Sequence, residues 1–314
     1  MSVENSTITT PVTIGVIGGS GLYSLFEEGT ATEVDVATPF GPTSSPISIG
    51  TMAGRRVAFL TRHGREHSVA PHRIAFRANV WALRSLGVRA LVSSSAVGGL
   101  HPDYAPGTFV LTDQIIDRTW GREDTFFDAG SVQHLSFADP FDPVLRRTAR
   151  DALEALGIDA KPTGTCVVIQ GPRFSTRAES IWLRNAGGHT INMTMSPEVP
   201  LAAELGIGTV NLSFVTDADA GLAPAEDEDG LEARPASDDT AGGPADAPAG
   251  QAQQAGQAET AVTHQLVMDR LAEANRTIVR AIESIVAGIP EDYAPRELVP
   301  ASATAEVLAR QVTA

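Results

Sequence analysis

Residues 56–99 have the sequence RVAFLTRHGREHSVAPHRIAFRANVWALRSLGVRALVSSSAVGG. Two apolar runs, within 56–64 and 90–99, enclose a stretch over 74–87 whose apolar side chains recur at helical spacing. A strand, a helix and a second strand in this order are typical of parallel strands, because parallel neighbours need a long crossover connection. This stretch therefore predicts a sheet covered by helices.

The same alternation of short apolar runs and helical patterns continues along the chain. Runs such as ALVSSS (90–95) and VNLSFVT (210–216) start with apolar residues on both parities, as do strands that helices cover on both faces. The sequence therefore predicts an α/β protein, a single domain with a central mixed or largely parallel β-sheet flanked by helices. The other expected strands are 13–19, 109–117, 166–172, 190–194 and 208–217, and the other expected helices are 144–157, 177–185, 198–205 and 264–289.

The composition is that of a globular protein, with 314 residues, 42% hydrophobic and 5% aromatic. The formal net charge of -15 argues against a nucleic-acid binder, whose phosphate contacts need clustered Lys and Arg. Residues 220–262 consist mainly of Ala, Gly, Pro, Asp, Glu and Gln, with almost no large apolar side chains. Because essentially one helix follows, we interpret 220–262 as a low-complexity, disordered loop insertion within one domain that spans 1–314.

The single cysteine, Cys166, excludes an intrachain disulfide, and its apolar neighbours favour a place in the core. The N-terminal residues contain no cationic stretch followed by an apolar run. No window approaches the ~18 apolar residues of a membrane helix. We therefore expect a cytoplasmic protein without membrane association.

Three of the expected strands end in groups that bind anions. Gly18–Gly21, with Ser20, follows the first strand, Arg62 and His63 follow the second, and Ser94–Gly99 ends a third. Open α/β sheets bind ligands at the carboxyl ends of strands, and guanidinium, hydroxyl and backbone donors suit a phosphate. The glycine spacing is neither GxGxxG nor a Walker loop, which disfavours a dinucleotide or nucleoside triphosphate. A plain tight turn remains an alternative for the glycine loop taken alone.

A zinc site is a second hypothesis for this region, because His63, His67 and His72 lie close together in the sequence. Arginines are interspersed among these histidines from Arg62 to Arg73. Cations beside a dication are unfavourable, so we expect no metal.

The segment 169–205 supplies an aromatic side chain and a carboxylate on adjacent loops. The Gly-Pro pair at 171–172 predicts a turn, and Phe174 follows it, where its ring would stack on a planar base. Glu198 is expected near the N-terminus of the helix 198–205. A carboxylate at that place can simply complement the helix dipole.

Asp217 and Asp219 follow the strand 208–217 at positions i and i+2, so they point the same way if strand geometry persists. Two acids that close raise each other's proton affinity, and one of them would then donate a proton near neutral pH. The alternative is that they only begin the acidic segment that follows.

Six motifs carry a resemblance to a known family. They are GVIGGSGLY (15–23), LTRHGREHSVAPHRIAFRANVWALRSLG (60–87), SSAVGGL (94–100), GPRFSTRAES (171–180), INMTMSPEVPLAAELGI (191–207) and TDAD (216–219). In these motifs and their order the chain resembles the trimeric purine nucleoside phosphorylases, most closely their 5′-methylthioadenosine phosphorylase branch. The resemblance covers Thr13 to Ile285 apart from the insertion, and it implies a mixed sheet wrapped by helices and a homotrimer or dimer of trimers.

The resemblance also implies roles for individual residues. Phosphate would lie among Ser20, Arg62, His63, Ser95, Ala96 and Thr194. Nucleoside contacts would come from Phe174 against the purine, Met193 under the ribose, His134 from the neighbouring subunit, and Met268 with Leu271 near an apolar 5′ pocket. The catalytic pair Asp217 and Asp219 would face N7 and the 6-substituent of the base.

The activity implied is phosphorolysis of S-methyl-5′-thioadenosine to adenine and 5-methylthioribose 1-phosphate, with inorganic phosphate as co-substrate and no cofactor. The first alternative is phosphorolysis of 6-oxopurine nucleosides such as inosine and guanosine. Family members that act on these typically have Asn in place of Asp217 and Glu in place of Ser175, so both positions favour a 6-amino purine. A hydrolytic nucleosidase and a non-catalytic nucleoside-binding protein are further alternatives, but the first gives Arg62 and His63 no purpose.

Overall fold

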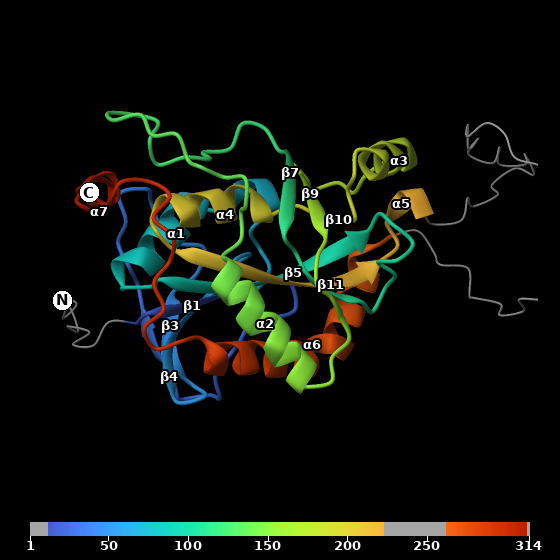
Figure 1. The fold of residues 1–314 in the computed structure, drawn as a ribbon, viewed down its shortest axis with the longest axis horizontal. Coiled ribbons are helices and arrows are strands. Elements are labelled where there is room, and N and C mark those ends of the chain that lie inside the picture. Colours follow the sequence, from blue (N-terminus) through green and yellow to red (C-terminus); the bar gives the residue numbers. More distant parts are fainter. Residues whose placement is uncertain (1–11, 223–261, 313–314) are drawn as a thin grey trace, which may run out of the picture.

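The computed structural model describes residues 12–222 and 262–312. Within these ranges the chain forms one mixed sheet of eleven strands with helices on both faces, which confirms the predicted fold class (Figure 1). The strands are β1 (Ile14–Gly18), β2 (Thr32–Val34), β3 (Ile47–Met52), β4 (Arg55–Thr61), β5 (Ala90–Gly99), β6 (Phe109–Leu111), β7 (Gln114–Arg118), β8 (Ala160–Lys161), β9 (Thr165–Ile169), β10 (Thr190–Asn192) and β11 (Gly208–Asp217). The helices are α1 (Phe76–Ser85), α2 (Pro143–Ala155), α3 (Arg177–Asn185), α4 (Met195–Glu204), α5 (Asp219–Leu222), α6 (His264–Gly288) and α7 (Ala301–Leu308), and a 3-10 helix, η1 (Pro71–Arg73), precedes α1.

Strand β5 lies in the middle of the sheet. It is parallel to β1 and β11 and antiparallel to β10, and β1 is in turn parallel to β4. The strand order is β2-β3-β4-β1-β5-β10-β9-β7, with β11 paired to β5 and β6, and β8 paired to β6. Because β4, β1, β5 and β11 are parallel neighbours, the loops that follow them meet at one edge of the sheet.

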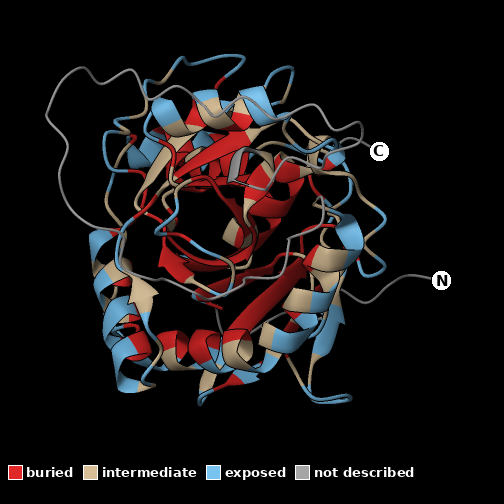
Figure 2. Ribbon diagram, turned by 90° about the vertical axis from the view of Figure 1, so that its right-hand side faces the viewer, coloured by how far each residue is buried: buried red, intermediate tan, exposed pale blue. Residues whose placement is uncertain are grey.

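The sheet divides the core into two parts, each covered by helices. α2 and α6 pack together on one face of the sheet, and α1 and α4 pack on the other (Figure 1). Alternate side chains of β1 point to these two faces, since Val16 packs in a cluster with Ile282 of α6 and Ile17 packs in a cluster with Leu83 of α1. Figure 2 shows the inner strands buried and the outward faces of the helices exposed. This burial on both faces accounts for the apolar residues on both parities of the strands.

The predicted strand 109–117 is two strands in the structure. β6 pairs with β11, whereas β7 pairs with β9 in another part of the sheet. The break falls at Thr112 and Asp113, where the Asp113 carboxylate accepts a hydrogen bond from Gly164 N at 2.8 Å. Both halves are apolar, so the sequence pattern did not separate them. The pattern also gave no prediction for β2, β3, β8 or α7.

The low-complexity segment predicted at 220–262 lies outside the described residues, except for its ends at 220–222 and 262. The first described range ends in α5, directly after β11. The second range begins at Val262, two residues before α6. Both ends of the segment therefore lie next to elements that carry predicted site residues.

Two other expectations concern the described elements. None of the described helices combines the length and the hydrophobicity needed to cross a membrane. Cys166 is fully buried in β9, and burial raises the pKa of its thiol to about 12. The cysteine is therefore a core residue, as the sequence predicted.

Candidate active site

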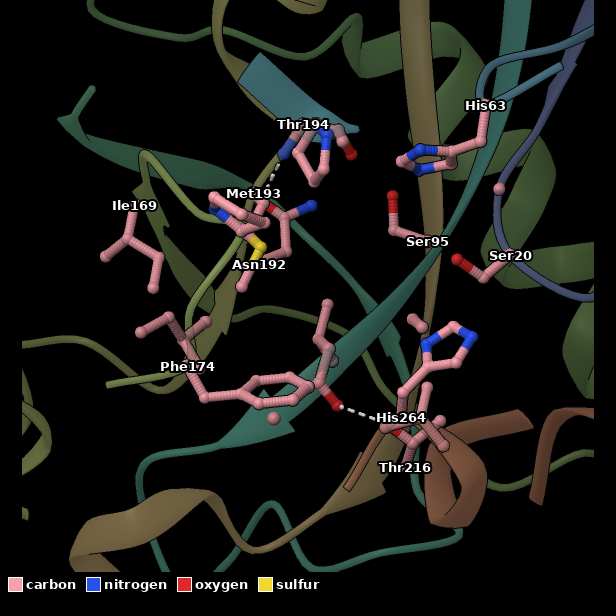
Figure 3. A pocket seen from close by; sticks show the side chains of 18 of the residues that line it. Ser20, His63, Ser95, Ile169, Phe174, Asn192, Met193, Thr194, Thr216 and His264 are labelled. Atoms are coloured by element: carbon pink, nitrogen blue, oxygen red, sulfur yellow. Dashed lines mark hydrogen bonds between the residues drawn. The ribbon is translucent and has the colours of Figure 1, made fainter. Parts of the chain in front are cut away.

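A cavity of about 360 Å³ lies where the carboxyl ends of the parallel strands meet. It is lined by the loops that follow β1, β4, β9 and β10, by the ends of β5 and β11, and by the start of α6 (Figure 3). Most of the predicted site residues lie on its surface, namely Ser20, Arg62, His63, Ser95, Ala96, Phe174, Met193, Thr194, Asp217 and Asp219. His134, Met268 and Leu271 are not among the residues that line it.

One part of the cavity has the character of an anion site. The side chains of Ser20, His63 and Ser95 point toward a common space in Figure 3. His63 Nδ1 lies 2.9 Å from the carbonyl oxygen of Val69, which can only accept, so Nδ1 carries the proton and Nε2 keeps a lone pair. Burial, followed by the charge of Arg62, lowers the pKa of His63 to about 4, so the ring is neutral near pH 7. Hydroxyl donors and one imidazole acceptor suit an anion that carries a proton.

Arg62 is held by the carboxylate of Glu198. The two side chains are 1% and 2% exposed, and the Glu198 oxygens accept from Arg62 Nε at 2.6 Å and from Nη2 at 2.8 Å. The carbonyl oxygen of Ser94 accepts from Nη1 at 3.1 Å. These three bonds fix the guanidinium plane and leave one N–H on each Nη for a ligand. The sequence interpretation of Glu198 as a helix-dipole residue was therefore incomplete, because its main partner is a buried cation far away in the sequence.

Two glycines make room for the polar groups of the cavity. A Cβ on Gly19 would lie 2.6 Å from the Ser94 carbonyl oxygen and 3.0 Å from Arg62 Nη1. A Cβ on Gly98 would lie 2.9 Å from Asp217 Oδ1. The backbone contact at 2.6 Å is shorter than a Cβ tolerates, so position 19 requires glycine, whereas a Cβ at position 98 would displace the Asp217 carboxyl group.

Asp217 and Asp219 form a buried carboxyl pair at the end of β11. Thr216 Oγ1 donates to Asp217 Oδ2 at 2.8 Å, and Ser180 Oγ donates to Asp219 Oδ2. Burial raises the pKa of Asp217 to about 6; the charge of Asp219 adds to this rise and the Thr216 bond opposes it. Burial also raises the pKa of Asp219, against the hydrogen bond from Ser180. Asp217 can therefore hold a proton close to neutral pH.

The pair is close for a different reason than the sequence suggested. Strand geometry does not persist, because the pairing of β11 shifts register between Val215 and Asp217, and Asp219 has a φ of 24° at the start of α5. Asp219 N donates to Asp217 Oδ1 at 3.1 Å across this turn. A turn closed by a hydrogen bond from the Asp219 backbone thus places both carboxyl groups at the same end of the cavity.

Phe174 lies on the loop before α3, 40% exposed, and its ring extends into the cavity (Figure 3). The start of α3 is fixed by a capping box, in which Glu179 N donates to Thr176 Oγ1 at 3.2 Å and Thr176 N donates to the Glu179 carboxylate at 2.7 Å. The capping box therefore also fixes the loop that carries Phe174.

Helix α6 contributes different side chains from those expected. His264 and Val267 line the cavity, whereas Met268 packs against the core cluster between α6 and the sheet. Leu271 lies beside a small neighbouring cavity. A Cβ added to Gly21 would lie 2.9 Å from the Cβ of Leu271, so the helix packs closely against this glycine. The helix was predicted correctly, but periodicity alone does not fix which of its apolar residues faces a ligand.

His134 is exposed on the long loop between β7 and α2. Its predicted role in a neighbouring protomer's site remains a prediction. Of the three histidines considered for zinc, His63 and His67 line the cavity with ring centroids 4.5 Å apart, and His72 does not line it. In the described part of the chain, no group of three or more His, Cys, Asp or Glu is arranged to hold a metal ion.

Arg122 is a residue that the sequence did not single out. Its Nη1 donates to the carbonyl oxygens of Met193 at 3.0 Å and Ser196 at 2.6 Å, and its Nη2 donates to that of Gln170 at 2.9 Å. Its Nε donates to the Gln170 side chain at 3.1 Å. One guanidinium therefore joins the loop after β9, which leads to Phe174, to the loop after β10, which carries Met193.

The strand ends of this α/β sheet place anion donors, an aromatic ring and two carboxyl groups around one cavity, an arrangement that suits a small ligand with an anionic part and a planar part. The chain belongs to the phosphorylase superfamily, whose family model matches residues 13–243. This membership confirms the family predicted from the sequence motifs.

Individual relatives agree with this assignment. The S-methyl-5′-thioadenosine phosphorylase of Mycolicibacterium smegmatis is 52% identical over 209 residues, which are 67% of this chain and 78% of the relative. A purine nucleoside phosphorylase of Streptomyces coelicolor is 49% identical over 221 residues, 68% of this chain and 78% of the relative. The structure of methylthioadenosine phosphorylase from Schistosoma mansoni with adenine aligns with a TM-score of 0.73 and 29% identity, over 88% of this chain and 91% of that chain.

Proposed function

We propose that the chain cleaves the N-glycosidic bond of S-methyl-5′-thioadenosine by phosphorolysis, giving adenine and 5-methylthioribose 1-phosphate. The observation that carries this proposal is that a buried acid able to hold a proton near pH 7, Asp217, shares one cavity with the anion donors Arg62 and Ser95. Relatives named S-methyl-5′-thioadenosine phosphorylase, 52% and 51% identical to this chain, support the choice of substrate.

The proposed chemistry follows from how charge develops. As the bond between C1′ and N9 breaks, the sugar becomes oxocarbenium-like and the purine accumulates negative charge. Asp217 donates its proton or a strong hydrogen bond to N7, which stabilises the leaving base. A phosphate oxygen held by Arg62, His63 and Thr194 then forms the new bond to C1′. Inorganic phosphate is a co-substrate in this scheme, and the reaction uses no metal or organic cofactor.

The choice of base depends on the carboxyl pair. Asp219, which accepts from Ser180, would also accept from an exocyclic 6-amino group, while Asp217 donates to N7. Together they suit adenine. The alternative is a purine nucleoside phosphorylase that acts on inosine and guanosine, in line with the name of the Streptomyces coelicolor relative. The carboxyl pair of Asp217 and Asp219 argues against it, since a carboxylate is a poor match for a 6-oxo group. Ser175 also argues against it, because family members that act on 6-oxopurines typically have Glu at this position.

We also propose that the enzyme works in the cytoplasm as a homotrimer or a dimer of trimers. In such an assembly His134 of one protomer would complete the site of the next. Sedimentation of the wild type tests the assembly, and comparison of the kinetics of the wild type and His134→Ala tests the role of His134. The variant should keep the wild-type mass and lose nucleoside affinity.

The experiment that tests the proposed function is product analysis with four substrates, each with and without phosphate. Release of adenine from methylthioadenosine that requires phosphate, faster than from adenosine, supports the proposal. Release of hypoxanthine and guanine from inosine and guanosine would favour the alternative. Release of base without phosphate would indicate a hydrolase and contradict both.

The loop-bridging Arg122 gives a first prediction. We expect Arg122→Lys to raise the KM for nucleoside about 10-fold or more, because an ammonium group cannot reach the carbonyl oxygens of both loops, and each hydrogen bond from a charged donor stabilises by about 1.5–3 kcal/mol. The KM for nucleoside is measured at saturating phosphate. Arg150→Lys, an exposed change on α2, is the control and should behave as the wild type. An unchanged KM would show that the loops hold their places without the guanidinium.

The polar edge formed by His264 gives a second prediction. The rings of His264 and His67 lie 5.4 Å apart, and His67 Nδ1 lies 3.2 Å from the Tyr23 hydroxyl, so this edge offers partners to a 5′-hydroxyl. We expect His264→Val to raise the kcat/KM ratio of methylthioadenosine over adenosine about 2- to 10-fold, since a lost hydrogen bond costs about 0.5–1.5 kcal/mol. The exposed Gln265→Val is the matched control. An unchanged ratio would show that the 5′ group lies elsewhere.

A further inference from the structure

A row of buried polar side chains leads from the cavity into the sheet. Ser95 of β5 lines the cavity. Asn211 and Ser213 lie on the neighbouring strand β11, and Thr112 follows β6. All four are at most 6% exposed. Asn211 Nδ2 lies 3.0 Å from Ser95 Oγ, Ser213 Oγ lies 2.8 Å from Asn211 Oδ1, and Thr112 Oγ1 lies 3.1 Å from Ser213 Oγ. The catalytic scheme above uses only the first member of this row.

The hydrogen bonds have a direction. An amide nitrogen only donates, and the two N–H groups of Asn211 point to Ser95 Oγ at 3.0 Å and to Ser93 Oγ at 2.8 Å. Ser95 Oγ is therefore an acceptor in this bond, and its own proton needs another acceptor. Among the described residues Ser95 Oγ has no hydrogen-bond partner besides Asn211, and the hydroxyl points into the cavity toward the same space as Ser20 and His63 (Figure 3).

We propose that Asn211 is a positioning residue that turns the Ser95 hydroxyl into a hydrogen-bond donor for phosphate. This inference rests on the proposed function, because it assumes that phosphate occupies the space in front of Ser95. Asn211 itself is fully buried in the middle of β11 and does not line the cavity. Its effect on phosphate therefore passes through Ser95.

Ser213 keeps the amide in this orientation. Ser213 donates to Asn211 Oδ1, which leaves Nδ2 for the two serines of β5. With the amide turned over, Oδ1 would face Ser95, whose proton would then point into the sheet. The hydroxyl would present only lone pairs to the cavity, and these repel a phosphate oxygen. The orientation of one buried amide thus decides whether Ser95 attracts or repels the anion.

The test compares Asn211→Asp with Asn211→Leu. A carboxylate only accepts, so Asn211→Asp draws the Ser95 proton into the sheet, and we expect the KM for phosphate to rise about 10-fold or more while the KM for nucleoside stays within about 2-fold. Asn211→Leu removes the orienting bond without reversing it, so its rise should be smaller. Thr112→Val, at the far end of the row, is the control, because it deletes a buried hydroxyl that does not touch Asn211.

A double-mutant cycle separates positioning from a general loss of structure. In a Ser95→Ala background, Asn211→Leu should no longer change the KM for phosphate, because the hydroxyl that it orients is gone. If the Asn211 variants do not fold, Ser213→Ala frees Oδ1 with Asn211 in place and should give a smaller selective rise. A KM for phosphate that is unchanged in the folded Asn211 variants, or in Ser213→Ala, overturns the inference. A wild type that releases base without phosphate overturns the proposed function instead.

Discussion

Replacing Asp217 by Asn should lower kcat for methylthioadenosine by about 100- to 10,000-fold, the range over which a positioned general acid accelerates a reaction. An amide can donate a hydrogen bond to N7 but cannot transfer a proton as the base departs. The KM for phosphate should change little, because Arg62, His63 and Ser95 remain. Steady-state kinetics with both substrates varied measures the two effects separately.

The pH dependence of wild-type activity provides an independent test of Asp217 as the general acid. Burial raises the pKa of Asp217 to about 6, and a general acid works in its protonated form, so kcat/KM for nucleoside should fall as pH rises through about 6. Asp217→Asn should lose this limb. Asp269→Asn, an exposed change on α6, is the control and should keep the wild-type rate and profile. Wild-type turnover by Asp217→Asn would refute the assignment of Asp217 as the acid.

The second large effect concerns stability. Glu198→Gln should lower the free energy of unfolding by about 3–5 kcal/mol, because it leaves the buried Arg62 cation without its counter-ion. Phosphate should restore part of this loss, since the anion would then balance the guanidinium, and the midpoint of unfolding should rise more with phosphate than it does for the wild type. Urea denaturation with and without phosphate measures both quantities.

A matched control for this prediction is Glu179→Gln. Glu179 also forms a two-pronged ion pair, with Arg173, but both side chains are exposed, and Gln can keep the helix cap. Water screens exposed pairs, so this variant should unfold at nearly the wild-type midpoint. Equal losses in the two variants would mean that burial of the Arg62–Glu198 pair contributes nothing special.

The sequence predicted the parts of the site that depend on local pattern. Strand ends are visible where apolar runs stop, so Ser20, Arg62 and Asp217 were found at the edge of the sheet where the cavity lies. Contacts between distant residues leave no such signal. Glu198 lies far along the chain from Arg62, and only the three-dimensional fold brings the two together.

The sequence also did not predict which side chains of a helix point into the cavity. The apolar pattern of α6 predicted the helix but not that His264 and Val267, instead of Met268, would line the cavity. The contribution of Arg122 was not predicted for a related reason, since its partners are backbone carbonyl oxygens, which every residue type provides. Side-chain patterns carry no information about such bonds.

Strand β5 lines the cavity with consecutive residues from Ser95 to Gly98, from the hydroxyl group at the anion site to the glycine beside Asp217. A strand rises about 3.3 Å per residue, so the backbone of β5 sets a spacing of roughly 10 Å between Ser95 and the glycine beside Asp217. The 5′ substituent would meet a separate element, α6. The residues of α6 that line the cavity, His264 and Val267, can therefore change without altering the spacing that β5 sets between Ser95 and Asp217.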